Sequence, residues 1–192
     1  MGRMLTAAII GAIIVFAWGA VSWTVLGWQK WVMTGTDDPA LVEAMKKTFK
    51  GNGVYVFPGP AMWKDPPATD AEKKAFGERL EAGPIGRIFY RQAGAKEFEP
   101  QVLLKGLLLS FAAALIAAVM LNMGARAGSS YISRVMIVVL MGMFSVLTTT
   151  FIEWNYWRLE DSYAMLMAAD LLVGWVAAAL VMAGMLAPRP AA

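Results

Sequence analysis

The sequence of 192 residues contains no cysteine and no histidine. Without cysteine no disulfide can form, and without either residue a zinc site built from Cys and His ligands is excluded. Haem ligation by a proximal histidine or a cysteine thiolate is excluded as well, and so are Ser-His-Asp and Cys-His nucleophiles. Proton chemistry would have to depend on carboxylates, lysine or tyrosine. We therefore expect no metal or other cofactor and assign no catalytic residue.

Charged residues are also scarce, at 16% of the chain, whereas 58% of the chain is hydrophobic. A typical soluble domain has about 25% charged and about 45–50% apolar residues. This composition argues against a soluble globular protein, and it also argues against disorder, which needs low hydrophobicity and high net charge. The net charge of +3 is too small to indicate nucleic-acid binding. The expected surroundings are the lipid bilayer.

Four long apolar runs account for this composition. Each has about 20 or more residues, which is enough to cross a hydrocarbon core of about 30 Å as a helix. The first run is too long for a signal peptide, so we expect an uncleaved membrane anchor. The four predicted transmembrane helices cover residues 4–28, 101–122, 132–152 and 163–186.

Arginines in the short links predict the orientation of the helices. The link between helices three and four contains acids beside its one arginine, whereas the N-terminus, the link between helices two and three, and the C-terminus contain arginine without acids. The predicted inner arginines are Arg3, Arg126, Arg134 and Arg189. Both termini are therefore expected inside. Aromatic residues at the opposite ends fit an interfacial belt: Trp23, Trp28, Trp31, Trp154, Tyr156, Trp157 and Tyr163.

The segment 29–100 carries most of the charge and contains ordered start and stop signals. Asp38 before Pro39 predicts the start of a helix that ends near residue 50, and Thr69 with Glu72 forms a capping box for a helix over 70–82. Strands are expected at 54–57 and 85–91. The sequence thus predicts a mainly α membrane protein: a four-transmembrane-helix bundle (residues 1–28 and 101–192) with a small α+β domain inserted between helices one and two.

The ionisable residues inside the predicted spans matter most for function, because charge is costly in lipid. Asp170 and Lys105 lie at comparable depths near the outer leaflet, and hydroxyls reach the same level. We expect one intramembrane polar layer formed by Asp170, Lys105, Thr148, Thr149 and Ser22. It could be a structural Lys105–Asp170 pair, a lysine that extends to the interface, a proton or ion site, an outward-opening pocket, or a contact with another subunit.

A second polar group lies at the predicted outer end of helix three. It comprises Glu153, Asn155, Trp157 and Arg158. Two carboxylates beside aromatic rings could suggest a glycosidase-like pair, but a dense polar loop is more typical of a solvated surface. The 14 methionines could ligate copper(I), yet their scatter over several helix faces favours adaptable packing.

Several stretches resemble a loose group of short bacterial four-span membrane proteins. The matching stretches are 22–28, 53–58, 154–157, 169–171 and 174–175. The group often has Pro-Trp-His where this chain has Gly27-Trp28-Gln29. The resemblance implies a four-span architecture and no particular chemistry. We expect a multi-pass protein of the bacterial inner (cytoplasmic) membrane with cytoplasmic termini and a periplasmic domain at 29–100.

Three functions remain open at this point. The first is an integral membrane accessory or structural protein that acts through its outer domain and helix faces, within a larger complex with other membrane subunits or with itself. The second is a small transporter or channel that uses the layer around Asp170 and Lys105. The third is a membrane-embedded enzyme, which would need a convergent acid and base that the sequence does not supply.

Overall fold

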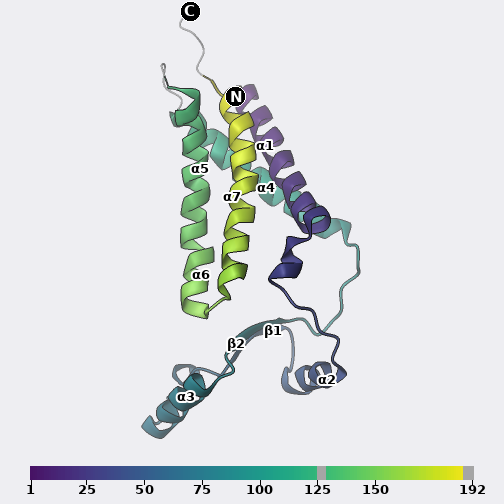
Figure 1. The fold of residues 1–192 in the computed structure, drawn as a ribbon, viewed down its shortest axis with the longest axis vertical. Coiled ribbons are helices and arrows are strands. Elements are labelled where there is room, and N and C mark those ends of the chain that lie inside the picture. Colours follow the sequence, from purple (N-terminus) through teal and green to yellow (C-terminus); the bar gives the residue numbers. More distant parts are fainter. Residues whose placement is uncertain (125–128, 188–192) are drawn as a thin grey trace, which may run out of the picture. The chain divides into compact units, whose positions relative to one another are not determined.

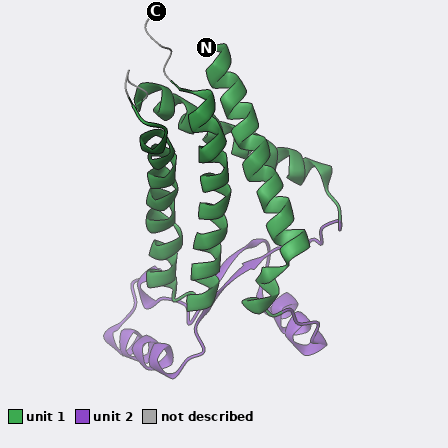
Figure 2. Cartoon of the chain, turned by 45° about the horizontal axis from the view of Figure 1, so that its top comes forward, with its two compact units in different colours: residues 1–34, 98–192 green, residues 35–97 purple. Residues whose placement is uncertain are grey.

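The computed structural model describes residues 1–124 and 129–187, and it divides into two compact units. One unit contains residues 1–34 and 98–192, and the other contains residues 35–97 (Figure 2). The protein is mainly helical. Four helical segments are long and apolar enough to cross a membrane, and they coincide with the four predicted helices: Gly2–Leu26, Pro100–Gly124, Tyr131–Trp157 and Asp161–Met185.

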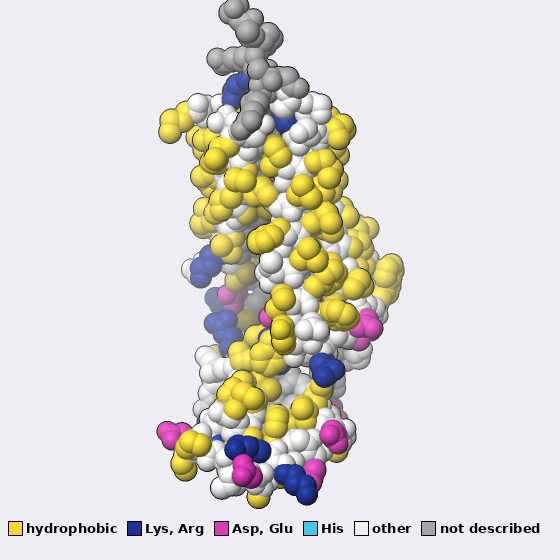
Figure 3. Space-filling view, turned by 90° about the vertical axis from the view of Figure 1, so that its left-hand side faces the viewer, with side chains coloured by type: hydrophobic (Ala, Val, Ile, Leu, Met, Phe, Trp, Pro, Cys, Tyr) yellow, Lys and Arg dark blue, Asp and Glu magenta, His cyan; other side chains and the backbone are white. Residues whose placement is uncertain are grey.

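Five α-helices build the first unit (Figure 1): α1 (Gly2–Ala20), α4 (Pro100–Gly124), α5 (Tyr131–Thr148), α6 (Thr150–Trp157) and α7 (Asp161–Met185). Helix α1 packs against both α4 and α7, and α5 packs against α7. Hydrophobic side chains cover most of the face of this unit in Figure 3, as expected for helices in contact with lipid.

Small residues form most of the buried core of the helical unit. Ala8, Ala114 and Ala178 are fully buried, and they come from three different helices. Gly11 of α1 leaves the space that the Met182 side chain of α7 fills. Such residues let helix backbones approach closely, and methionine adapts to the gaps between them.

Two of the four spans contain irregular backbone, although neither contains proline there. After α1 the chain forms a π-helix, η1 (Val21–Leu26), which ends at Gly27 in the left-handed region (φ 58°) and continues into the 3-10 helix η2 (Trp28–Trp31). In the third span Thr149 (φ −117°, ψ −72°) separates α5 from α6. The hydroxyl of Thr149 donates to the Ser145 carbonyl at 2.6 Å, a bond that bends helices.

Arginine side chains cap the C-terminal end of α7. The last carbonyls of a helix have no partner in the helix itself. Here Arg134 Nε donates to the Ala183 carbonyl at 2.9 Å, and Arg3 Nη2 donates to the Met185 carbonyl at 2.7 Å. The start of α1 and the start of α5 are thereby fixed to the end of α7. Two other arginines used to predict orientation, Arg126 and Arg189, lie outside the described residues.

The second unit contains α2 (Pro39–Thr48), β1 (Gly53–Phe57), the 3-10 turn η3 (Ala61–Trp63), α3 (Asp70–Ala82) and β2 (Gly86–Tyr90). The predicted caps are confirmed: the Asp38 side chain accepts from the Ala40 amide, and Thr69 and Glu72 form the capping box of α3. Strands β1 and β2 pair antiparallel as one ribbon, so the expected two-stranded sheet is present.

One face of the ribbon is closed by an aromatic cluster. The ring of Phe49, which follows α2, stacks on Tyr55 at 4.0 Å between centroids and meets Tyr90 edge-on at 5.1 Å. Residues of the opposite face alternate with these along the strands. On that face Val54 pairs with Phe89 across the ribbon.

Candidate functional site

Asp170 of α7 is bound by tryptophans of the first span. Trp18 Nε1 donates to Asp170 Oδ1 at 2.8 Å and to the Asp170 backbone carbonyl at 2.9 Å. Trp23 Nε1 donates to Asp170 Oδ2 at 3.3 Å. Both carboxylate oxygens therefore accept from indole N–H groups, and these bonds tie the first span to the fourth.

The π-helix explains why two tryptophans reach one carboxylate. On a regular α-helix, residues five apart point about 140° away from each other. Trp18 and Trp23 are five apart and bracket the start of η1, where the backbone bonds run from i to i+5. The wider turn brings both indoles toward the same side of the span. The π-helix thus positions both indoles to donate to the carboxylate.

A third tryptophan completes what we call the Asp170–tryptophan cluster (Asp170, Trp18, Trp23 and Trp28). The rings of Trp18 and Trp28 meet edge-to-face with centroids 5.8 Å apart. Trp28 Nε1 is buried and has no acceptor among the described residues. Gly174, one turn after Asp170, provides the space for Trp18: a Cβ at this glycine would lie 2.8 Å from Trp18 Cδ1.

Lys105 does not pair with Asp170 in the part of the chain that the structure describes. Lys105 is exposed on α4, whereas Asp170 is bonded to the tryptophans of the α1 span. The physical reason is the order of the helices, since α1 packs against both α4 and α7 and supplies the donors itself. Among the alternatives for this layer, the structure thus has no Lys105–Asp170 pair within the described residues, and neutral indole donors bind Asp170 instead.

The hydroxyls of the expected polar layer bond within their own helices. Thr148 donates to the Phe144 carbonyl at 2.7 Å, and Thr149 donates to the Ser145 carbonyl. Both threonines are exposed. Ser22 is fully buried, and its hydroxyl donates to the Gly19 carbonyl at 3.2 Å. Of the residues expected in this layer, the structure joins only Asp170 to another helix.

Ser22 instead supports the turn that follows the first span. Its carbonyl accepts from the Gly27 amide at 3.2 Å and from Gln29 Nε2 at 3.3 Å. Gln29 is only 8% exposed, so its amide is a buried group satisfied by the backbone of the π-helix. This contact fixes the chain direction after Gly27, and it positions Trp28 beside Trp18.

The outer interfacial cluster lies on the surface of α6 and its C-cap. Glu153, Asn155, Trp157 and Arg158 are all exposed. Arg158 adopts the left-handed conformation (φ 51°) that ends α6. Exposed side chains on one short helix enclose no substrate, so this geometry is that of a surface.

Neighbouring acids stabilise the start of α7. The hydroxyl of Ser162 donates to Glu160 and lowers the pKa of its carboxyl, with a further contribution from the Tyr163 amide. Trp154 Nε1 donates to Asp161 Oδ1 at 2.7 Å, which links α6 to the first turn of α7. Negative groups are favourable at a helix N-terminus, so these acids stabilise the N-terminal end of α7.

Sequence reasoning missed the tryptophans as partners of Asp170. The sequence places Trp23 and Trp28 in an interfacial belt and gives no role to Trp18. The signal was the five-residue spacing of Trp18, Trp23 and Trp28. On an α-helix, side chains at that spacing point in different directions. They point to the same side only when the backbone widens into a π-helix.

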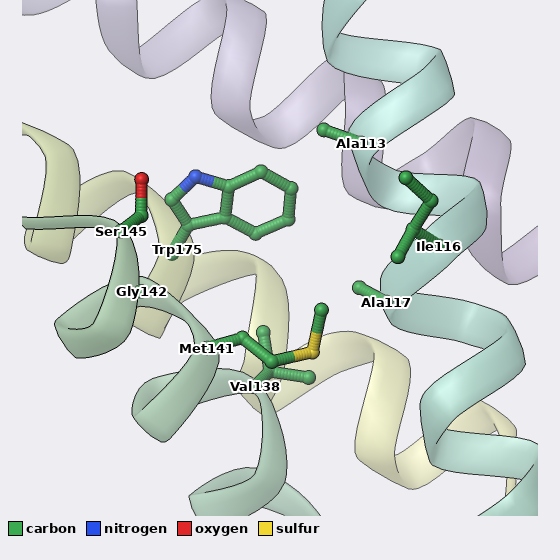
Figure 4. A pocket seen from close by; sticks show the side chains of 8 residues that line it. All are labelled: Ala113, Ile116, Ala117, Val138, Met141, Gly142, Ser145 and Trp175. Atoms are coloured by element: carbon green, nitrogen blue, oxygen red, sulfur yellow. The ribbon is translucent and has the colours of Figure 1, made fainter. Parts of the chain in front are cut away.

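An apolar pocket lies elsewhere in the helical unit, between α4 on one side and α5 and α7 on the other (Figure 4). Its volume is about 250 Å³. Eight residues line it: Ala113, Ile116, Ala117, Val138, Met141, Gly142, Ser145 and Trp175.

No protein-family model, no curated protein and no solved structure matches the chain.

Proposed function

We propose that the chain is an integral membrane accessory protein that acts through residues 35–97 as a subunit of a larger membrane complex. The carrying observation is how few hydrophobic residues this unit buries fully. Its buried hydrophobic residues are Ala61 and Ala68 alone among those described. A domain of about 60 residues needs to bury about 60% of its chain surface to be stable, and two alanines supply little of that.

Large apolar side chains of the same unit are exposed. On the open face of the ribbon, Phe89 is 71% exposed and Val54 is 55% exposed. In the 3-10 turn, Met62 is 83% and Trp63 is 63% exposed. Exposed apolar groups of this size mark interaction sites, and a partner subunit that covers them would supply the missing core.

Photo-cross-linking in intact membranes tests this function. A benzophenone side chain at position 89 lies on the open ribbon face, and the same side chain at position 74 lies on the exposed, polar helix α3 as a matched control. We expect position 89, and not position 74, to yield one discrete protein adduct. Adducts with lipid alone at position 89, or equal labelling at both positions, would contradict the proposal.

The proposed orientation is that of a multi-pass protein of the bacterial inner membrane, with cytoplasmic termini and residues 35–97 in the periplasm. The support is the distribution of charge over the helix ends. Arg3 and Arg134 lie at the end of the bundle where α7 finishes. Glu160 and Asp161 lie at the opposite end, where α7 begins. Arginine is favoured on the cytoplasmic side.

A small transporter is the second candidate, favoured by the irregular backbone near Asp170. Interrupted helices beside an intramembrane carboxylate are typical of transporter sites, and η1 supplies such an interruption. In proteoliposomes, Asp170→Asn would abolish ion flux without a large change in thermal stability if this function applied. Absence of any flux above protein-free vesicles in the unmodified protein would exclude it.

A further inference from the structure

The pocket between α4, α5 and α7 contains two polar atoms that have no partner within the described chain. Trp175 Nε1 and Ser145 Oγ line it together with apolar side chains, and neither atom makes a hydrogen bond to any described residue. Figure 4 shows the Trp175 ring between Ser145 of α5 and Ala113 of α4. Indole N–H is a donor only, and a serine hydroxyl can also donate. The pocket therefore offers two donors to an acceptor.

The depth of the pocket restricts what can supply that acceptor. Trp175, Ser145 and Ala113 lie near the middle of the spans Asp161–Met185, Tyr131–Trp157 and Pro100–Gly124. Phospholipid headgroups lie about 15 Å from the midplane of a hydrocarbon core of about 30 Å. A phospholipid would place only its acyl chain here, which leaves both donors without a partner.

The pocket is open to the side where lipid would lie. Ile116, at its edge, is 60% exposed, and small residues leave the space in the wall of α4: Ala113 and Ala117. Gly142 of α5 lines the pocket without a side chain. A ligand could therefore enter from the bilayer without unfolding the bundle.

We propose that this pocket binds a lipid-soluble molecule with a carbonyl oxygen on a small ring, of the quinone class, and that Trp175 and Ser145 donate to that oxygen. A volume of about 250 Å³ accommodates a single ring, while an attached chain extends into lipid. This site is independent of the function proposed for residues 35–97, and it uses different residues.

Titration of the full-length protein with decylubiquinone, followed by the indole N–H resonances, tests the proposal. Loss of one resonance in Trp175→Phe assigns the Trp175 signal. We expect that signal to shift saturably with the quinone and to stay in place with decylbenzene, which has the same tail and a ring without carbonyl. The other indole resonances report whether the fold is intact.

A pair of matched variants localises the binding. Ala113→Leu fills the pocket and is expected to weaken binding at least tenfold, whereas Ala112→Leu adds the same volume at an exposed position next to it and is expected to leave binding unchanged. Ser145→Ala, which adds no volume, is expected to weaken binding severalfold. This variant replaces Ala113→Leu as the test if Ala113→Leu does not fold. An unmoved Trp175 signal, an equal shift with decylbenzene, or a shift that depends on protein concentration and not on quinone would overturn the proposal.

Discussion

The carboxylate of Asp170 lies in a helix that is long and apolar enough to cross a membrane, and inside a bilayer a polar group needs a partner from the protein. Trp18 and Trp23 provide two indole donors. An indole carries a large apolar surface with one polar atom. Tryptophan can therefore face lipid and still satisfy a carboxylate, which a lysine could do only by burying its charge.

We expect removal of this carboxylate to lower the stability of the folded protein moderately. Asp170→Ala removes the bonds from Trp18 to Oδ1 and from Trp23 to Oδ2, but Trp18 keeps the backbone carbonyl as an acceptor. At about 1 kcal/mol for each lost bond, we expect a loss of about 1–2 kcal/mol in thermal stability assays in detergent. Asp170→Asn keeps an acceptor for Trp18 and should lose less.

Lys105 provides the discriminating control for this prediction. Because Lys105 is exposed, Lys105→Met should change stability by no more than about 0.5 kcal/mol. The double variant with Asp170→Ala should be as unstable as Asp170→Ala alone. A buried ion pair would behave differently, with a loss of about 3–5 kcal/mol on removal of one partner. Recovery of stability in the double variant would refute the indole assignment.

Glu72 gives a prediction for the charged unit. The bond from Lys64 Nζ, at 2.6 Å, and the Thr69 amide lower the pKa of the Glu72 carboxyl from 4.5 to about 2. The ionised form is favoured in the fold. The contribution of ionised Glu72 to the stability of the fold is thus complete above pH 4.5. This contribution is lost as the pH falls from 4.5 through about 2. A carboxyl ¹³C titration of the full chain should show a midpoint near 2.

Substitution of the lysine separates the causes of this shift. In Lys64→Met the largest contribution is removed, while the Thr69 bonds of the capping box stay. The Glu72 midpoint should then move up toward its ordinary value without reaching it. An unchanged midpoint would show that Lys64 does not bind Glu72 in solution.

At the scale of the helix, Gly174 controls how closely α1 approaches α7. A Cβ at Gly174 would lie 2.8 Å from Trp18 Cδ1, so Gly174→Ala must displace the indole from Asp170. Overpacking of this kind costs about 1–3 kcal/mol, measured as a lower thermal midpoint in detergent.

Gly184→Ala is the matched control, because it makes the same change in the same helix. The nearest atom to a Cβ there is Tyr131 Cε2 at 4.0 Å, and Gly184 is exposed. Alanine is favoured over glycine in a helix by about 1 kcal/mol, so this variant should be neutral or more stable. Equal thermal midpoints for the two variants would contradict the close packing of Trp18 on Gly174.

Elements set by neighbouring residues were predictable from the sequence, and contacts between distant elements were not. The Thr69–Glu72 capping box and the Asp38 cap involve residues two or three apart, so their signals survive in the sequence alone. The four spans follow from apolar length. The partner of Asp170 depends on which helices are adjacent and on a π-helix without proline. The five-residue spacing of the tryptophans is the one local sign of that π-helix, and it does not identify Asp170 as their partner.

Charged groups stabilise both ends of α7, and two of them connect this helix to α1 and α5. At its C-terminal end, Arg3 and Arg134 donate to the terminal carbonyls, where cations are favourable. At its N-terminal end, the Glu160 carboxylate accepts from the Tyr163 amide. The charge asymmetry that predicts membrane orientation is therefore also the charge asymmetry that stabilises this helix.

Reporter fusions test the orientation of the entire chain. With arginine-rich ends in the cytoplasm, a fluorescent protein fused after Ala192 should fold and fluoresce, and alkaline phosphatase fused within residues 60–70 should be active, because it matures only outside the cytoplasm. Fusions of each reporter at the other position serve as controls and should be inactive. Phosphatase activity of the fusion after Ala192 would contradict this prediction and show the opposite orientation. The arginines that cap α7 would then lie outside, and the capping of α7, not a preference of arginine for the cytoplasm, would account for their position.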